Sequence, residues 1–421
     1  MLKFLKRAIG RAKRNARMVR LNYLKYNQGF RPTAIQKLTE GHPGVKVTEL
    51  HPAFTSNLGL DAKFIEDCSP YIRPAESVEF PAAFIASVRN GRIFAYDINN
   101  FAVITEDNKL IEEASFQWVD APVPASQNRV FKTQGFTKPK KFSGTVFSLL
   151  TMGAARYYYF HWLFDAMTKL ELLRASGQFD TVDYFFVPNY DSHFQKEYLA
   201  HFNIPEHKII NVQVEDHIQA DNLLVTSEVR LEEHLPKWSV DFLYDSFVKP
   251  AEMKRGGRRI YIARGDAAKS RKVSNESELI KVLSSQGFEI LYLTKVSVKD
   301  QVKIFNEAEL VVAVHGGGLS NLVYCEPGTT VLEIFPDQYV RHYYYDICVK
   351  RNIEYDYLLC ESEKACDNLV DGELVGLTAD INAIQNKINL LMGRNHVTKT
   401  NIVKSENPGL SRNYMIWTAA S

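Results

Sequence analysis

The second half of the chain alternates short apolar strands with helical segments, and this alternation restricts the possible folds more than any other feature. Strands are predicted at 258–264 (RRIYIAR), 288–294 (FEILYLT) and 310–314 (LVVAV), with a helical segment after each of the first two. Continuous apolar strands that alternate with helices are typical of a parallel sheet with both faces covered. Residues 145–248 repeat the alternation, which predicts a second unit of the same kind.

At 421 residues the chain is longer than one average domain, so we expect two. The predicted fold class is α/β, with two Rossmann-like domains that face each other across a cleft and a β-rich N-terminal portion. Within that portion, Asn90-Gly91 predicts a β-hairpin. The expected divisions are a basic helix (1–31), an N-terminal domain (32–250), a C-terminal domain (251–395) and a tail (396–421).

Composition excludes several classes of function. The net charge is only +2, which argues against a nucleic-acid partner. The five cysteines form no CxxC pair, which argues against a disulfide framework or a zinc site and fits a reducing compartment. No stretch has the length of a transmembrane helix, and charges interrupt the N-terminus where a signal peptide would be apolar. These features predict a cytoplasmic protein.

Residues 1–31 carry ten lysines and arginines and no acid. Their apolar residues recur at steps of three and four, which places them on one side of a helix. A basic amphipathic helix can lie on an anionic membrane surface. The alternative is a solvated or disordered arm whose charges only aid solubility.

His315, Gly316, Gly317 and Gly318 directly follow the apolar strand at 310–314. At the carboxyl end of such a strand, glycines let the backbone approach a ligand, and the following helix offers free N–H groups to a phosphate. The alternative is a tight turn in which the histidine binds a neighbouring carbonyl. The dinucleotide fingerprint GxGxxG and the P-loop are absent, and no GxSxG elbow supports an esterase.

Two further groups of residues suggest chemistry. His161 and Asp165 are four residues apart and share one face of a predicted helix, where they provide a candidate general base. The alternative is a core histidine and a surface acid. A basic loop follows the strand at 258–264 and is a second candidate for phosphate binding. Its basic residues are Arg264, Lys269, Arg271 and Lys272.

The segment from YIARGDAAKSRKVSNE through VVAVHGGGLSN to PGTTVLEIFP resembles the core of glycosyltransferase family 61. Members typically show Tyr-x-Ser-Arg, Arg-x-x-x-Asn-Glu and His-Gly-Ala-Gly-Leu-Thr-Asn. Upstream, FHWLFD is similar to the family's aromatic-His-x-x-x-Asp helix, and the resemblance covers roughly residues 145–340. The matching positions are Arg264, with Ala263 in the serine position; Arg271, Asn275 and Glu276; and the loop from His315 to Asn321, where Gly317 replaces alanine and Ser320 replaces threonine.

The resemblance implies a GT-B architecture and an inverting transfer from a nucleotide sugar, usually a UDP-sugar. It places the donor on the C-terminal domain and the acceptor on the N-terminal one. The chain has no Asp-x-Asp motif, so we expect no metal cofactor; the diphosphate would be neutralised by Arg264, Arg271 and His315. Asn321 closes the donor loop, and Glu333 is the candidate for the ribose hydroxyls. Asp165 is the first choice for the base, with His161 in reserve.

Relatives in plants and animals work behind a membrane anchor or signal. The predicted lack of both here resembles a bacterial member that builds a surface polysaccharide, such as capsule or lipopolysaccharide. The basic segment 1–31 would then hold the enzyme near a lipid-linked glycan acceptor at the inner face of the membrane. The alternative from another class is a non-catalytic scaffold that binds nucleotide sugars or glycans.

Overall fold

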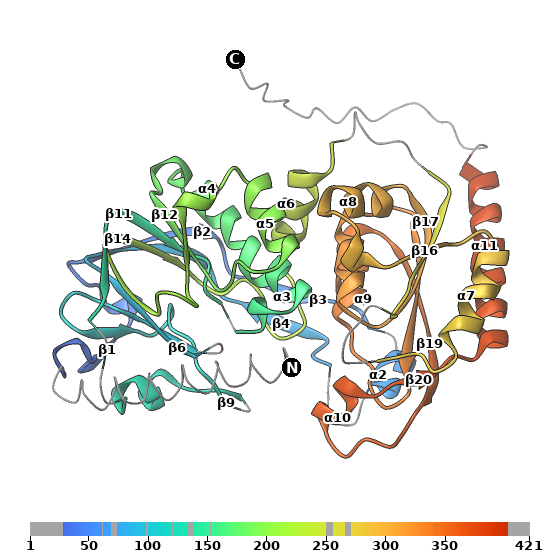
Figure 1. Ribbon diagram of the computed structural model, residues 1–421, viewed down its shortest axis with the longest axis horizontal. Helices are drawn as coiled ribbons and strands as arrows, with labels where there is room; N and C mark the ends of the chain where they lie inside the picture. The colour runs from blue at the N-terminus through green and yellow to red at the C-terminus, as the bar shows by residue number, and fades with distance from the viewer. Residues whose placement is uncertain are drawn as a thin grey trace, which may run out of the picture.

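The computed structural model describes residues 28–60, 62–68, 74–97, 100–119, 121–133, 136, 138–151, 153–249, 256–265 and 271–402. The predicted basic helix lies almost entirely outside these residues, as do Lys269 and most of the predicted tail. Two sheets lie side by side with a layer of helices between them (Figure 1). The α/β fold class is therefore confirmed.

The C-terminal sheet has six strands, of which the first five in spatial order are parallel and the last is antiparallel. In spatial order they are β16 (Glu289–Leu291), β15 (Arg258–Ile262), β17 (Ala308–Val314), β18 (Thr330–Pro336), β19 (Glu354–Ser362) and β20 (Leu377–Thr378). One face packs against α7 (Glu276–Ser285) and α11 (Ile381–Ile402). The other packs against α8 (Val298–Asn306), α9 (Tyr343–Arg351) and the 3-10 helix η11 (Gly317–Tyr324). The short α10 (Leu369–Leu374) precedes β20.

The N-terminal sheet is mixed and has ten strands, because the β-rich portion and the strand–helix portion form a single sheet. Its parallel part consists of β14 (His217–Thr226), β11 (Lys140–Ser148), β12 (Tyr184–Val187) and β13 (Ile209–Asn211). The β-rich portion adds β1 (Ala34–Gln36), β2 (Val45–His51), β5 (Ala83–Arg89), β6 (Arg92–Asp97), β7 (Asn100–Ile104) and β8 (Lys109–Ile111). Two small pairs lie outside it: β3 (Phe54–Asn57) with β4 (Ser77–Phe80), and β9 (Trp118–Val119) with β10 (Ala121–Pro122).

The hairpin predicted at Asn90-Gly91 is wrong. Strands β5 and β6 do not pair with each other; both run antiparallel to β14, one beyond the other. A type I′ hairpin turn needs positive φ at both central residues, and here only Asn90 has it (φ 50°). A single left-handed residue bends the chain without reversing it, so the two strands continue in one direction.

The sequence places Glu278 three residues after Asn275, a spacing typical of a capping box, but no capping box forms at the start of α7. Asn275 occupies the N-cap position but makes no side-chain bond to the helix. Its Oδ1 instead accepts from the backbone N–H of Ala379 at 2.9 Å, and its Nδ2 donates to the carbonyl of Ala379 at 3.0 Å. A tertiary partner just before α11 has replaced the local one.

The helices between the two sheets belong to one continuous buried cluster that includes Leu163 and Phe147 from the first half and Val311 and Leu322 from the second. The first half contributes α3 (Tyr159–His161), the π-helix η6 (Trp162–Met167), α4 (Lys169–Ala175), α5 (His193–His201) and α6 (Lys237–Phe247). Of these, α5 and α6 face α8 and α9 across the middle of the molecule (Figure 1), and α3 and α6 also contact η11. The two halves therefore share a core.

A segment from the beginning of the chain also packs on the C-terminal sheet. Helix α2 (Ala62–Asp67) lies beside β19 and β20 in Figure 1, where its blue ribbon stands among the orange strands. The rings of Phe64 and Tyr357 are 4.9 Å apart edge to face, and the Tyr357 hydroxyl donates to Asp67 at 2.7 Å. We call residues 54–68 the strap.

Candidate active site

The glycine loop follows β17 at the place where ligands bind in sheets of this kind. In spatial order β15 and β17 are neighbours, but the segments that follow them pack on opposite faces of the sheet. Such a point, where the winding of the sheet reverses, leaves a crevice at the carboxyl ends of the two strands. Arg264 follows β15 and His315 follows β17, so both stand at this crevice.

Gly316 is needed because Arg264 occupies the space of a side chain. A Cβ on Gly316 would lie 2.5 Å from Nη1 of Arg264. The backbone of Gly316 is extended (φ 168°, ψ 167°), a conformation open to any residue, so the requirement is one of space. The guanidinium therefore lies directly over the loop backbone.

The next two glycines have different surroundings. A Cβ on Gly318 would lie 2.9 Å from Cδ1 of Leu293 and 3.1 Å from Cγ2 of Ile262 at the end of β15, so this glycine permits close packing. A Cβ on Gly317 would meet only Cβ of Tyr159, at 3.8 Å. That position has room for the alanine that is usual in the family resembled.

Arg271 holds the loop from the other side. Its Nε donates to the carbonyl of His315 at 2.8 Å, and its Nη1 donates to the carbonyl of Glu373 at 2.7 Å. Nε of Arg264 donates to the carbonyl of Arg271 at 3.3 Å. Burial, together with the positive charge of Arg271, lowers the pKa of Arg264 to about 10. Two guanidinium groups thus stand close together at the loop.

His315 is a neutral hydrogen-bonding group. Burial lowers its pKa well below the ordinary value, and the charges of Arg271 and Arg341 lower it further. Its Nδ1 lies 2.5 Å from Oε1 of Glu333, whose pKa burial raises well above the ordinary value. A protonated Glu333 donates to Nδ1, which leaves the histidine hydrogen on Nε2 as a donor. Glu333 itself is fully buried and also accepts from Tyr355 at 2.6 Å, so it positions His315.

The first half contributes His161 and Asp165, which form a hydrogen-bonded pair. Nδ1 of His161 lies 2.7 Å from Oδ2 of Asp165. The carboxylate also accepts from Nε of Arg230 at 2.8 Å and from Nη2 of Arg230 at 3.3 Å. Burial alone would raise the pKa of Asp165, but the charge of Arg230 and the hydrogen bonds from Arg230 and His161 outweigh it and hold that pKa well below its usual range.

The two members of this pair differ in access. Asp165 is 1% exposed and both its oxygens are engaged. The side chain of His161 is 23% exposed, and among the residues described its Nε2 has no hydrogen-bonding partner. Asp165 therefore fixes the orientation and tautomer of the ring, while Nε2 of His161 can reach a ligand. Asp165 lies in the π-helix η6, a rare conformation that is frequent at functional sites.

Residues 159–332 match the family model described as Glycosyltransferase 61. The match runs from α3 into β18, so it includes His161, Arg264, Arg271 and the glycine loop. Residues of this chain are also 33% identical over 63 positions to a beta-1,2-xylosyltransferase of Arabidopsis thaliana and 37% identical over 59 positions to beta-1,2-xylosyltransferase RCN11 of Oryza sativa subsp. japonica. These matches cover 15% and 14% of this chain and only 12% and 11% of the relatives.

A polar network within the matched residues joins the two halves of the molecule. The Tyr159 hydroxyl on α3 donates to Oδ1 of Asn321 on η11 at 2.7 Å and lies 2.6 Å from the hydroxyl of Tyr198. Nδ2 of Asn321 donates to Oε1 of Gln301 at 2.9 Å. Asn321 is fully buried, so it fixes the loop rather than facing a ligand. The network places α3, with His161 at its end, against the glycine loop.

The structure therefore brings together most of the residues predicted from the sequence, and it buries two of them completely. Arg264, Arg271, His315 and the glycine loop meet at one crevice, whereas Glu333 and Asn321 lie beneath it. Two arginines were missed. Arg230 follows β14 in an irregular segment, and Arg341 pairs with Glu233 and donates to Tyr343 at 2.8 Å. Neither lies in a motif or a periodic stretch, so the sequence gives no sign of them.

Among the residues that the structure describes, histidine, cysteine and acidic side chains nowhere gather in threes as metal ligands would. No described helix is long and apolar enough to cross a bilayer.

Proposed function

We propose that this protein is an inverting glycosyltransferase of GT-B architecture, with the donor on the C-terminal half and the acceptor on the N-terminal half. The observation that carries the proposal is the arginine-lined glycine loop at the switch point between β15 and β17, with the His161–Asp165 pair brought against it by Tyr159. The glycosyltransferase 61 match over these residues supports it.

The leaving diphosphate is bound by groups at the crevice. Arg264 and Arg271 supply positive charge, and Nε2 of His315 supplies a neutral donor. Helix η11 begins in the same glycine loop, so its first N–H groups are further candidate donors. Preorganised donors of this kind stabilise the charge that develops on a leaving group. We assign to these two arginines the role that a divalent cation has in metal-dependent transfer, so no metal is required.

His161 is assigned as the base in preference to Asp165. Asp165 is buried and salt-bridged, and its lowered pKa makes it a poor proton acceptor. Nε2 of His161 takes the proton of the acceptor hydroxyl, the hydroxyl oxygen attacks the anomeric carbon, and the bond from that carbon to the diphosphate oxygen breaks. Attack on the face opposite the leaving group inverts the anomeric centre. A positioned base contributes about 10²–10⁴-fold in rate.

The donor is proposed to be a UDP-sugar that carries a pentose or a hexose. Because both relatives are named as xylosyltransferases, UDP-xylose is the first donor to test. The acceptor is proposed to be a glycan or lipid-linked glycan of a bacterial surface polysaccharide, such as capsule or lipopolysaccharide. Residues 1–31 would hold the enzyme at the cytoplasmic face of the membrane, where such an acceptor lies.

The test measures UDP binding and UDP release separately, without metal and with a chelator. We expect release from UDP-xylose or a UDP-hexose, loss of UDP binding in Arg264→Gln, and a rate at least about 10²-fold lower in His161→Gln with UDP binding unchanged. His193→Gln, at an exposed histidine of α5, is the control. No binding of any nucleotide refutes the proposal. If UDP binds but is not released from any donor, and His161→Gln does not change that binding, the protein is the non-catalytic scaffold. If UDP release occurs only after Mn²⁺ or Mg²⁺ is added back, the metal-independent step is refuted.

A further inference from the structure

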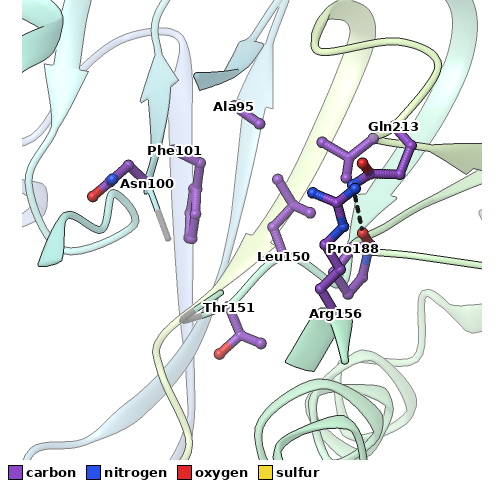
Figure 2. Close-up of a pocket in the computed structure, with 9 residues that line it drawn as sticks. Ala95, Asn100, Phe101, Leu150, Thr151, Arg156, Pro188 and Gln213 are labelled. Carbon is purple, nitrogen blue, oxygen red and sulfur yellow. Dashed lines mark hydrogen bonds between the residues drawn. The ribbon is translucent and has the colours of Figure 1, made fainter. Parts of the chain in front are cut away.

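A second hollow lies at the carboxyl ends of the parallel strands of the N-terminal sheet. Its walls come from the residues after β11 (Leu150 and Thr151), after β12 (Pro188) and after β13 (Gln213), together with Arg156. The cavity itself has a volume of about 20 Å³, and it is partly open to solvent. Figure 2 shows the side chain of Arg156 extending beside Pro188 toward Gln213. We call this hollow the Arg156 pocket.

Arg156 is the charged residue of this lining, and no counter-ion neutralises it at close range. Among the residues described, its guanidinium makes no hydrogen bond or ion pair, and its Nε is buried without a partner. Burial lowers the pKa of Arg156, while Tyr157 and Asp191 act in the opposite direction. The nearest aromatic contact is the ring of Tyr157, whose centroid lies 4.9 Å from Cζ. A guanidinium without a paired acid in a partly closed hollow is suited to an external anion.

The backbone of Arg156 is fixed in place. Its carbonyl accepts from Nδ2 of Asn189 and from Nε2 of Gln195, each at 3.2 Å, and both of these side chains are buried. The guanidinium therefore extends from an anchored position, so a ligand does not have to order the chain that bears it.

The remaining polar groups of the lining are neutral and partly engaged. Oγ1 of Thr151 donates to Glu228 at 2.6 Å, and Nε2 of Gln213 donates to the carbonyl of Pro188 at 3.3 Å. The pocket thus combines one positive charge with apolar walls such as Leu150. This composition favours a small anionic group over a neutral sugar ring, because a guanidinium binds carboxylate and phosphate oxygens in pairs.

We propose that the Arg156 pocket binds an anionic substituent, a carboxylate or a phosphate, on the acceptor sugar or on the residue next to it. The inference rests on the proposed function, since it is the assignment of the N-terminal half to the acceptor that makes the ligand an acceptor. Arg156 stands five residues before His161, and both lie at the carboxyl edge of the same sheet.

The test uses three probes with the full-length protein and saturating UDP, so that the donor site is filled. Methyl β-glucuronide supplies a carboxylate, glucose 6-phosphate supplies a phosphate, and methyl β-glucoside is neutral. Ligand-observed NMR gives the affinity of each for the wild type, Arg156→Gln, Arg156→Lys and Lys196→Gln. Lys196→Gln removes an exposed positive charge from α5 in the same half and is the matched control.

We expect at least one anionic probe to bind the wild type about tenfold more tightly than the neutral one, since charged hydrogen bonds contribute that much or more. Arg156→Gln should remove this preference, Arg156→Lys should reduce it, and Lys196→Gln should leave it intact. The better probe identifies the anion. Equal affinity for the neutral probe, no binding of either anion, or anion binding unchanged in Arg156→Gln overturns the inference. If the inference is overturned but UDP binds normally, the proposed function stands. If anion binding depends on Arg156 but UDP does not bind, the inference about the pocket stands and the proposed transferase function is refuted.

Discussion

The three adjacent glycines predict three different outcomes for substitution by alanine. At Gly316 a new Cβ would lie 2.5 Å from Nη1 of Arg264, whereas ordinary contact begins at 3.4 Å, so the guanidinium must move by about 0.9 Å. A displacement near 1 Å of a positioning group costs about 10²-fold in rate. Because the tip of a flexible side chain moves, we expect the unfolding temperature to change little.

The neighbouring positions provide the matched controls. Gly317→Ala meets only Cβ of Tyr159 at 3.8 Å, so both stability and activity should stay close to wild type. Gly318→Ala places its Cβ against Leu293 and Ile262 in the core, and overpacking of this kind costs typically about 1–3 kcal/mol. We expect that variant to melt at a lower temperature.

Thermal unfolding and UDP release, measured on all three variants, separate these effects. Loss of activity with retained stability in Gly316→Ala, next to an unaffected Gly317→Ala, supports a loop shaped around Arg264. The reasoning is refuted if Gly316→Ala keeps full activity, or if Gly317→Ala loses as much as Gly316→Ala.

Three further predictions follow from the contacts described. Tyr159→Phe removes the donor to Asn321 and leaves a buried oxygen unpaired, at a cost of about 1–3 kcal/mol. Tyr158→Phe, on an exposed ring, is the control, and equal unfolding temperatures of the two variants would contradict the network. Arg230→Met leaves the buried Asp165 carboxylate without its cationic partner and should destabilise the protein by about 3–5 kcal/mol in chemical denaturation. The double variant with Asp165→Asn should recover much of this loss, and no recovery would count against the pair. Although burial alone would raise the pKa of Glu233, His342 and Arg341 lower it from 4.5 to about 2. This shift contributes about 3 kcal/mol to the free energy of unfolding. The contribution is complete above about pH 5 and is lost as the pH falls toward 2. Glu233→Gln should flatten the wild-type stability profile over that range, and identical slopes would argue against the assignment.

The second half of the chain was predictable because its strands are wholly apolar runs. Val311 and Val312 pack on opposite faces of one sheet, so such a strand has no polar side and its pattern is unmistakable. The glycine loop was predictable for a related reason, since three consecutive glycines remove every side chain from the end of a buried strand, where a ligand would lie. Predictions from local sequence failed where a distant partner determined the structure. Pairing of β5 and β6 with β14 replaced the hairpin predicted at Asn90-Gly91, and hydrogen bonds to Ala379 replaced the capping box at Asn275.

The roles of the site residues depended on burial, which spacing cannot reveal. Four residues of separation correctly predicted that His161 and Asp165 meet, but not which of them faces a ligand. That depends on Arg230, which lies 65 residues farther along the chain and binds the carboxylate from the loop after β14. Glu333 was assigned to ribose hydroxyls for the same reason, although it lies beneath His315.

The strap at 54–68 means that the exchangeable unit of this protein is not a continuous stretch of sequence. A chimera that joined the first 250 residues to the second half of a relative would seat this chain's Phe64 on a foreign surface in place of Phe335, Tyr345 and Tyr357. Burial of one phenylalanine contributes roughly 1.5–3 kcal/mol, so the mismatch alone can decide whether the hybrid folds. Any recombination of the two halves therefore has to move the strap together with the C-terminal sheet that it covers.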